Sequence, residues 1–306
     1  MELCGCLLAT TATDVFLKTA GLTVREQQNT PVFCRQPLLA TENAPWKKQT
    51  MEYVRLGKTN LLISRVALGA FRLVDSKSEK IEDEAAQIVR KAYDEGINFY
   101  DASRKIENSE KLLGDALYDI KKNVFISTTT SARTVSEIKS DLELSLNNLH
   151  CDSLDLYQFE TEKFLPLPHG ADNIYDTLLQ LKNENKIKHI GIVTTNLETA
   201  IKAVESDLYE TIQFPFNVLS SDAVIELVKL CQEHDVGFIA MQPLCGGVVD
   251  NIPLAFGFLK QYENVVTIWG VQTTEQMEQI LYFNEHPPVI DEQFNKDVEK
   301  VRNFFN

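Results

Sequence analysis

Residues 124–160 decide the fold class and read VFISTTTSARTVSEIKSDLELSLNNLHCDSLDLYQFE. Their two ends, Val124–Thr130 and Ser153–Glu160, are short runs rich in β-forming residues, which predict strands. Between them, apolar residues recur at three- and four-residue steps, which is the period of a helix with one buried face. Thr134 with Glu137 forms a capping-box pattern at its start. A strand, a helix and a strand in this order predict a parallel β–α–β unit.

The same unit recurs along the chain, so that strand candidates alternate with helical patterns. The strand candidates are Arg65–Phe71, Ile97–Ser103, Val124–Thr130, Ser153–Glu160, His189–Thr195, Thr211–Leu219, Val236–Leu244 and Val265–Val271. Eight such units predict an α/β fold in which the strands close into a (β/α)8 TIM barrel. An open doubly wound sheet is the alternative, which we disfavour because no glycine-rich fingerprint follows the first strand.

A hairpin is expected ahead of the barrel. Tyr53–Gly57 and Leu61–Ser64 are alternating stretches on either side of a turn-prone centre, which predicts an N-terminal β-hairpin. Residues 1–50 show no sustained period. We therefore expect two parts: an N-terminal extension, residues 1–50, that is flexible or precedes the native start, and a barrel, residues 51–306.

The composition excludes several classes of function. The formal net charge is −14, whereas a nucleic-acid surface needs a basic patch. No run of eighteen or more apolar residues occurs, so no membrane span is expected. The acidic start is a poor signal peptide, which favours a cytoplasmic protein. The six cysteines lack metal-ligand spacing, so the sequence predicts no metal site.

Seven segments of the barrel portion carry a recognisable combination of residues. They are Tyr53–Thr59, Leu61–Gly69, Gly96–Asp101, Ser109–Leu117, Leu144–Leu149, Asp155–Gln158 and Lys186–Ile192. With them the chain resembles the aldo-keto reductases from about Glu52 to Phe283. Gln213–Asn217 and Met241–Leu244 are similar to a bacterial branch that often carries a C-terminal ferredoxin module. This chain has no cysteine after Cys245 to hold such a module.

The resemblance implies transfer of hydride from a nicotinamide cofactor to a carbonyl group, with a tyrosine as proton donor tuned by a lysine, an aspartate and a histidine. Matched by motif, the aspartate is Asp101. The tyrosine position holds Ile106, the lysine position Thr129 and the histidine position Glu160. Isoleucine has no proton to donate and threonine has no positive charge, so this tetrad is degenerate. The candidate catalytic residues that remain are Asp101 and Glu160.

Two roles for these carboxyl groups stay open. As a pair in the barrel mouth without a lysine, at least one of them should have a raised pKa and could take part in acid–base chemistry. Alternatively, Asp101 is a vestige that binds neighbouring hydroxyls such as those of Thr128 and Thr130, and Glu160 is solvated at the rim.

Other residues are candidates for smaller roles near the mouth. Arg104 or Lys105 could supply the lost positive charge from a loop, and His169 could replace the lost acid. Trp269 could cap the pocket or pack in the helix layer. Cys245 is interpreted as a plain loop cysteine, because no histidine is near it in the sequence.

The resemblance also implies contacts to NAD(P)H. These fall on Thr195, Asn196, Gln213, Gln242, Gly270 and Gln276. The first three are polar groups that could orient the nicotinamide amide. Gly270 and Gln276 stand where many members carry a lysine and an arginine, so the clamp for a 2′-phosphate is missing. Backbone amides at the start of the following helix could still bind a pyrophosphate.

Three functions are consistent with these features. The first, which we favour, is a divergent NAD(P)-linked oxidoreductase of the aldo-keto reductase type that acts on an unknown small molecule. The second is a catalytically inactive binding or regulatory protein. The third is a cofactor-independent acid–base enzyme that uses Asp101 and Glu160. The substrate and the oligomeric state are not predicted.

Overall fold

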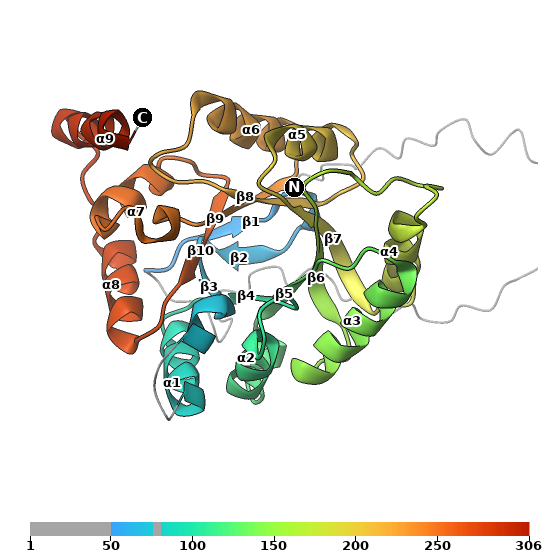
Figure 1. The fold of residues 1–306 in the computed structure, drawn as a ribbon. Helices are drawn as coiled ribbons and strands as arrows, with labels where there is room; N and C mark the ends of the chain where they lie inside the picture. The colour runs from blue at the N-terminus through green and yellow to red at the C-terminus, as the bar shows by residue number, and fades with distance from the viewer. Residues whose placement is uncertain (1–49, 76–80, 306) are drawn as a thin grey trace, which may run out of the picture. The chain divides into compact units, whose positions relative to one another are not determined.

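Eight parallel strands close into a barrel in the computed structural model, which describes residues 50–75 and 81–305 (Figure 1). The strands are β3 (Val66–Gly69), β4 (Phe99–Ser103), β5 (Phe125–Thr130), β6 (Leu154–Glu160), β7 (Ile187–Val193), β8 (Thr211–Pro215), β9 (Gly237–Met241) and β10 (Val265–Gly270). Each strand pairs with the next along the chain, and β10 closes the ring on β3. The predicted (β/α)8 TIM barrel is therefore confirmed.

Helices surround the barrel in Figure 1. Within the described residues they are α1 (Ile81–Asp94), α2 (Ser109–Leu117), α3 (Val135–Asn148), α4 (Ile174–Asn183), α5 (Leu197–Glu205), α6 (Asp222–Glu233), α7 (Ile252–Lys260), α8 (Thr274–Glu285) and α9 (Glu292–Phe305). The predicted hairpin is also present, as β1 (Tyr53–Arg55) paired antiparallel with β2 (Leu62–Ser64). The predicted extension lies outside the described residues except for Thr50, so its boundary stays a prediction.

Five strands end earlier than predicted. The strands end at Gly69, Val193, Pro215, Met241 and Gly270, where the predicted ones continued to Phe71, Thr195, Leu219, Leu244 and Val271. Beyond these points the chain turns away into loops, and after β3 it turns at once into a 3-10 helix, η2 (Ala70–Asp75). Helix α7 was not predicted, because its sequence is apolar nearly throughout and shows no polar face. Its start is nevertheless marked, since Asn251 caps it.

Two apolar cores follow from the alternation of side chains along the strands. The smaller one lies inside the barrel and consists of Leu56, Ile63, Ala67, Phe99, Phe125, Leu156, Ile239, Val266 and Ile268. Leu56 and Ile63 belong to the hairpin segment, which therefore closes the end of the barrel where the strands begin. The larger core lies between the outer faces of the strands and the helices. We call the opposite end of the barrel, where the strands end, the barrel mouth. The interior near the mouth is not filled by this apolar core and holds other side chains.

A buried carboxylate, Glu110 of α2, joins the elements on one side of the barrel. It is 1% exposed. Its Oε1 accepts hydrogen bonds from Thr128 Oγ1 of β5 (2.8 Å) and Ser145 Oγ of α3 (2.6 Å), and its Oε2 accepts one from Asn148 Nδ2 (3.3 Å). Arg104, in the loop before α2, forms an ion pair with the same carboxylate. Because a buried charge is tolerated only when it is paired and fully hydrogen-bonded, this cluster fixes the loop after β4 against β5 and α3.

We predict that Glu110→Ala lowers the free energy of unfolding by about 3 kcal/mol, because it leaves an arginine and three polar groups without their shared partner. Urea denaturation followed by circular dichroism measures the loss. Glu107→Ala, an exposed glutamate in the same loop, is the control and should change stability by less than about 0.5 kcal/mol. Equal losses in the two variants would contradict the role given to Glu110.

Candidate functional site

A polar layer crosses the barrel interior on the mouth side of the apolar core. We define it as Asp101 of β4, Gln158 of β6 and Gln213 of β8, all of them buried. Gln158 Nε2 donates to Gln213 Oε1 (2.5 Å), and Gln213 Nε2 donates to Asp101 Oδ2 (3.3 Å). These three strands are alternate members of the ring, and in such barrels alternate strands contribute side chains to one interior layer. The polar layer is thus the last tier of the barrel core below the mouth.

Two hydroxyl groups complete the hydrogen bonds of the polar layer. Gln158 Nε2 also donates to Ser127 Oγ of β5 (3.2 Å), and Thr211 Oγ1 of β8 donates to Gln158 Oε1 (3.4 Å). Ser127 lies opposite Asp101 in the sheet register. The amide nitrogen and the amide oxygen of both glutamines are therefore hydrogen-bonded. From Thr211 through Gln158 and Gln213, each group donates to the next one, and the last bond reaches the carboxyl group of Asp101.

Burial raises the pKa of Asp101 to about 7, and hydrogen bonds from Ser127 and Gln213 lower it by less than burial raises it. The side chain is 7% exposed. Within the described residues its second oxygen, Oδ1, has no partner with hydrogen-bond geometry. Asp101 is thus a buried carboxyl group whose pKa is shifted upward toward neutral pH.

The alternative role for Asp101, as a vestige holding nearby hydroxyls, is wrong for the two threonines named. Thr128 and Thr130 lie on the outer face of β5, where Thr128 Oγ1 binds Glu110 and Thr130 Oγ1 binds Asp141 (2.5 Å). Side chains alternate along a strand, so the residues of β5 that share the interior with Asp101 are Ser127 and Thr129 instead.

Glu160 ends β6 one interior tier nearer the mouth than Gln158, and its side chain is 24% exposed. Lys105 of the β4–α2 loop places Nζ 3.1 Å from Glu160 Oε1. The pKa of Asp101 is therefore raised by burial, and the like-charge repulsion expected from Glu160 is not among its causes. Of the two loop cations, Lys105 reaches the mouth, whereas Arg104 is held by Glu110.

Ile106 and Thr129, two of the residues that the resemblance placed at tetrad positions, have side chains without acid–base chemistry. Ile106 is half-buried in the β4–α2 loop, where its N–H donates to Ser103 O (3.1 Å). Thr129 is buried on β5. Neither residue contributes a charge or an ionisable proton to the interior. Besides Asp101, Glu160 and Lys105, the described residues at this end include two more ionisable groups, Arg133, which donates to Glu160 O (3.1 Å), and Glu162, which binds Thr195.

The residues expected at the nicotinamide end are bound to other parts of the chain. Thr195 N and Oγ1 both donate to Glu162 Oε2, each at 3.0 Å, and Thr194 Oγ1 donates to the same oxygen (3.1 Å). Asn196 caps α5, with Oδ1 accepting from Thr199 N (2.9 Å). Sequence reasoning missed Glu162, for which the only signal was an acidic residue two positions after a strand end. Asn196 Nδ2 and Gln213 remain as amide groups on this side of the mouth.

The residues expected at the phosphate end lack a clamp. A Cβ atom on Gly270 would lie 2.5 Å from Phe71 Cζ and 2.6 Å from Arg72 Cγ, so η2 covers the place where a longer side chain would stand. Gln276 Oε1 accepts from Gln272 N (2.7 Å), and Gln276 N donates to Thr273 Oγ1 (3.3 Å). Gln276 thus helps to cap α8. Two backbone N–H groups at this helix start, those of Gln272 and Gln276, are thus already bonded within the chain.

Several other candidates lie away from the polar layer. His169 is 93% exposed with Nδ1 3.5 Å from Asp176, so it does not replace the lost acid. Gln242 is exposed in the loop after β9, where its carbonyl accepts from Asn217 Nδ2 (3.1 Å). Met241 is half-buried at the end of β9. Burial raises the pKa of the Cys245 thiol, which is typical of an unreactive cysteine.

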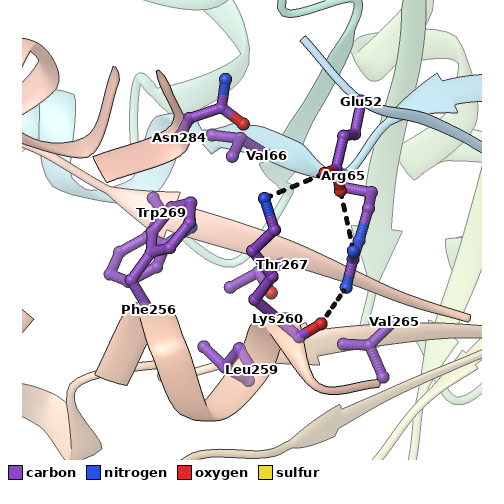
Figure 2. Close-up of a pocket in the computed structure, with 10 residues that line it drawn as sticks. All are labelled: Glu52, Arg65, Val66, Phe256, Leu259, Lys260, Val265, Thr267, Trp269 and Asn284. Carbon is purple, nitrogen blue, oxygen red and sulfur yellow. Dashed lines mark hydrogen bonds and ion pairs between the residues drawn. The ribbon is translucent and has the colours of Figure 1, made fainter. Parts of the chain in front are cut away.

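Trp269 belongs to the helix layer and does not cap the mouth. Its ring stacks on Phe256 of α7 with 5.9 Å between the centroids. Figure 2 shows both rings beside a small hollow on the outer side of β10, where Glu52 bridges Lys260 (2.9 Å) and Arg65 (2.8 Å). This hollow lies outside the barrel, so it is not part of the candidate site.

Two further properties bear on the chemistry. Across residues 50–75 and 81–305, no group of three or more His, Cys, Asp and Glu side chains is placed to bind a metal ion. In the same ranges no helix is both long and apolar enough to cross a membrane.

We predict that Asp101 makes the protein less stable as the pH rises from about 4 to about 7. In this window the folded protein keeps a proton that the unfolded chain has lost, so deprotonation favours unfolding, by about 4 kcal/mol over the whole window. Above pH 7 this dependence ends. Urea unfolding at several pH values tests the prediction, with Asp101→Asn as the comparison. If both proteins show the same pH dependence, the pKa of Asp101 is not raised.

Comparison with known proteins identifies relatives that have the same fold and a protein family that matches this sequence. The Aldo/keto reductase family matches residues 65–254. L-galactose dehydrogenase of Arabidopsis thaliana is 26% identical over 214 residues, which cover 65% of this chain and 67% of that protein. The probable aldo-keto reductase 1 of Glycine max is 24% identical over 222 residues, covering 65% and 63%. The match thus spans about two thirds of these curated relatives.

Solved structures are similar over most of the chain. An aldo-keto reductase of Bacillus halodurans in its holo form superposes with a TM-score of 0.70 at 18% identity, covering 82% of this chain and 96% of that one. An aldo-keto reductase of Klebsiella pneumoniae in complex with NADPH also has a TM-score of 0.70, at 16% identity, covering 82% and 95%. These likenesses concern the fold, whereas the family match covers more than half of the sequence. The chain belongs to the aldo/keto reductase family.

Proposed function

We propose that this protein is a divergent NAD(P)-linked oxidoreductase that acts on a small molecule in the barrel mouth, with Asp101 as its proton-carrying residue. The observation that carries the proposal is the environment of Asp101. Its carboxyl group is buried at the mouth end of the interior, is bonded on one oxygen by Gln213 and has a pKa of about 7. A catalytic acid or base works best when its pKa lies near the working pH.

The side chains present fit one end of a nicotinamide cofactor. Asn196 would bind the carboxamide through Nδ2, whereas the Gln213 amide is already bonded to Gln158 and Asp101. The opposite end does not fit NADP, since neither Gly270 nor Gln276 can bind a 2′-phosphate by charge. A bound cofactor would supply hydride. The chain itself would orient the substrate and hold a proton at Asp101.

The two carboxyl groups have different environments, which supports different roles. Asp101 has no cation beside it and is partly neutral near pH 7. Glu160 pairs with Lys105 at the rim, with 3.1 Å between Lys105 Nζ and Glu160 Oε1. We therefore assign proton transfer to Asp101 and contacts with the polar part of a substrate to Glu160 and Lys105. The acid–base enzyme without a cofactor, which required Asp101 and Glu160 to act as a pair, is less well supported by this separation.

A second candidate function, a binding protein without catalysis, is favoured by one observation. The chain's own side chains occupy the cofactor positions: Glu162 binds Thr195, and η2 covers Gly270. In both functions we expect a small-molecule ligand, no nucleic acid because of the net charge of −14, and a cytoplasmic location. Cofactor binding and turnover distinguish the two.

We predict that NADH binds at least as tightly as NADPH, because no cation stands at the two clamp positions. Quenching of protein fluorescence, titrated up to millimolar cofactor, measures both affinities. Gln276→Arg should raise the affinity for NADPH about tenfold and leave that for NADH nearly unchanged. Absence of binding by either cofactor would reject the oxidoreductase and leave the binding protein.

We also predict that Asp101→Asn lowers turnover at least about 100-fold, since it removes the ionisable proton while keeping the size of the side chain. Oxidation of NADH with a panel of small aldehydes, ketones and enones provides the assay. Lys105→Met is the comparison, and it should affect substrate affinity more than turnover. Full activity of the Asp101→Asn variant would overturn the assignment.

A further inference from the structure

The hydrogen bonds of the polar layer run in one direction. Gln213 presents its donor Nε2 to Asp101 Oδ2, so Oδ2 is the accepting oxygen and a proton on this carboxyl group lies on Oδ1. Gln213 Oε1 then faces Gln158, which must present its own Nε2. Gln158 Oε1 in turn accepts from the hydroxyl of Thr211. The orientation of the Gln158 amide therefore sets that of the Gln213 amide, which in turn decides which Gln213 atom faces Asp101.

We propose that Gln158 is a positioning residue for Asp101: by donating to Gln213 Oε1 it holds the Gln213 amide with Nε2 toward Asp101 Oδ2, so that Oδ1 is the oxygen that carries and transfers the proton. This inference rests on the proposed function in that Asp101 is the reacting group. Without Gln158, the Gln213 amide is free to turn and to present Oε1 to Asp101. Oε1 can only accept, so the proton would then move to Oδ2 and remain bound there.

The surrounding chain makes room for Gln158 in this position. Gly191 of β7 has no side chain where it faces the interior, and a Cβ atom there would lie 2.1 Å from Thr211 Oγ1 and 3.0 Å from Gln158 Oε1. Any other residue at 191 would displace this part of the polar layer. The amide of Gln158 is also bonded at both of its polar atoms. Its Nε2 donates to Ser127 and Gln213, and its Oε1 accepts from Thr211. A side chain held at both ends can orient its neighbour.

The test follows the titration of Asp101 directly. Carbon NMR of protein labelled at the aspartate carboxyl group, assigned by the signal missing in Asp101→Asn, gives the pKa of Asp101. Gln158→Met keeps the volume and removes the donor, and we expect it to raise the pKa of Asp101 by about one pH unit, because an accepting Oε1 stabilises the protonated form. In a Gln213→Met background the same change should leave the pKa unchanged, since Gln158 acts through Gln213.

Thr267→Val is the matched control, since Thr267 is a buried threonine that lines the outer hollow and has no bond to the polar layer. If Gln158→Met fails to fold, Gln158→Asn is the second variant, because its amide is one methylene too short to reach Gln213. An unchanged pKa in the single variant, or an equal shift in both backgrounds, overturns the proposal. Because the experiment measures the titration of Asp101, its result does not depend on whether the protein turns over a substrate or binds a cofactor.

Discussion

Closure of the eight-stranded sheet forces every second side chain of each strand into an interior that is filled by side chains alone. Near the strand starts this requirement is met by apolar residues and by the hairpin that covers them. At the mouth end the sequence places Asp101, Gln158 and Gln213 in the same kind of position. Because buried polar groups must find partners, these three can only bind one another and the adjacent hydroxyls. The candidate site is a consequence of this constraint.

Burial explains the state of Asp101. The polar layer offers it amide and hydroxyl donors, and these compensate the loss of water only in part. The carboxyl group therefore shifts toward its neutral form. At the rim of the mouth, Glu160 forms an ion pair with Lys105. One carboxyl group of the barrel mouth is thus desolvated, whereas the other is paired with a cation.

The rest of the mouth is organised by contacts between loops. Glu162 supplies acceptors for the hydroxyl groups at the end of β7, and η2 packs over Gly270 at the end of β10. Arg104 is directed away from the interior by its pair with Glu110, which leaves the next residue, Lys105, to turn toward Glu160. A ligand that binds across the mouth must therefore exchange hydrogen bonds with these groups, which restricts it more strongly than an open pocket would.

The sequence by itself determined the eight strands, the hairpin and the cap at Thr134, because each depends on residues within a few positions of one another. Only the tertiary structure decided the partners of the site. Gln213 meets Asp101 across 112 residues of chain, and Lys105 meets Glu160 across 55. Such contacts depend on strand register, on the stagger of the closed barrel and on the course of loops, which have no period in the sequence. The sequence thus named Asp101, Gln213 and Glu160 in advance, whereas Gln158, Glu162 and the bonds of the site were found only in the tertiary structure.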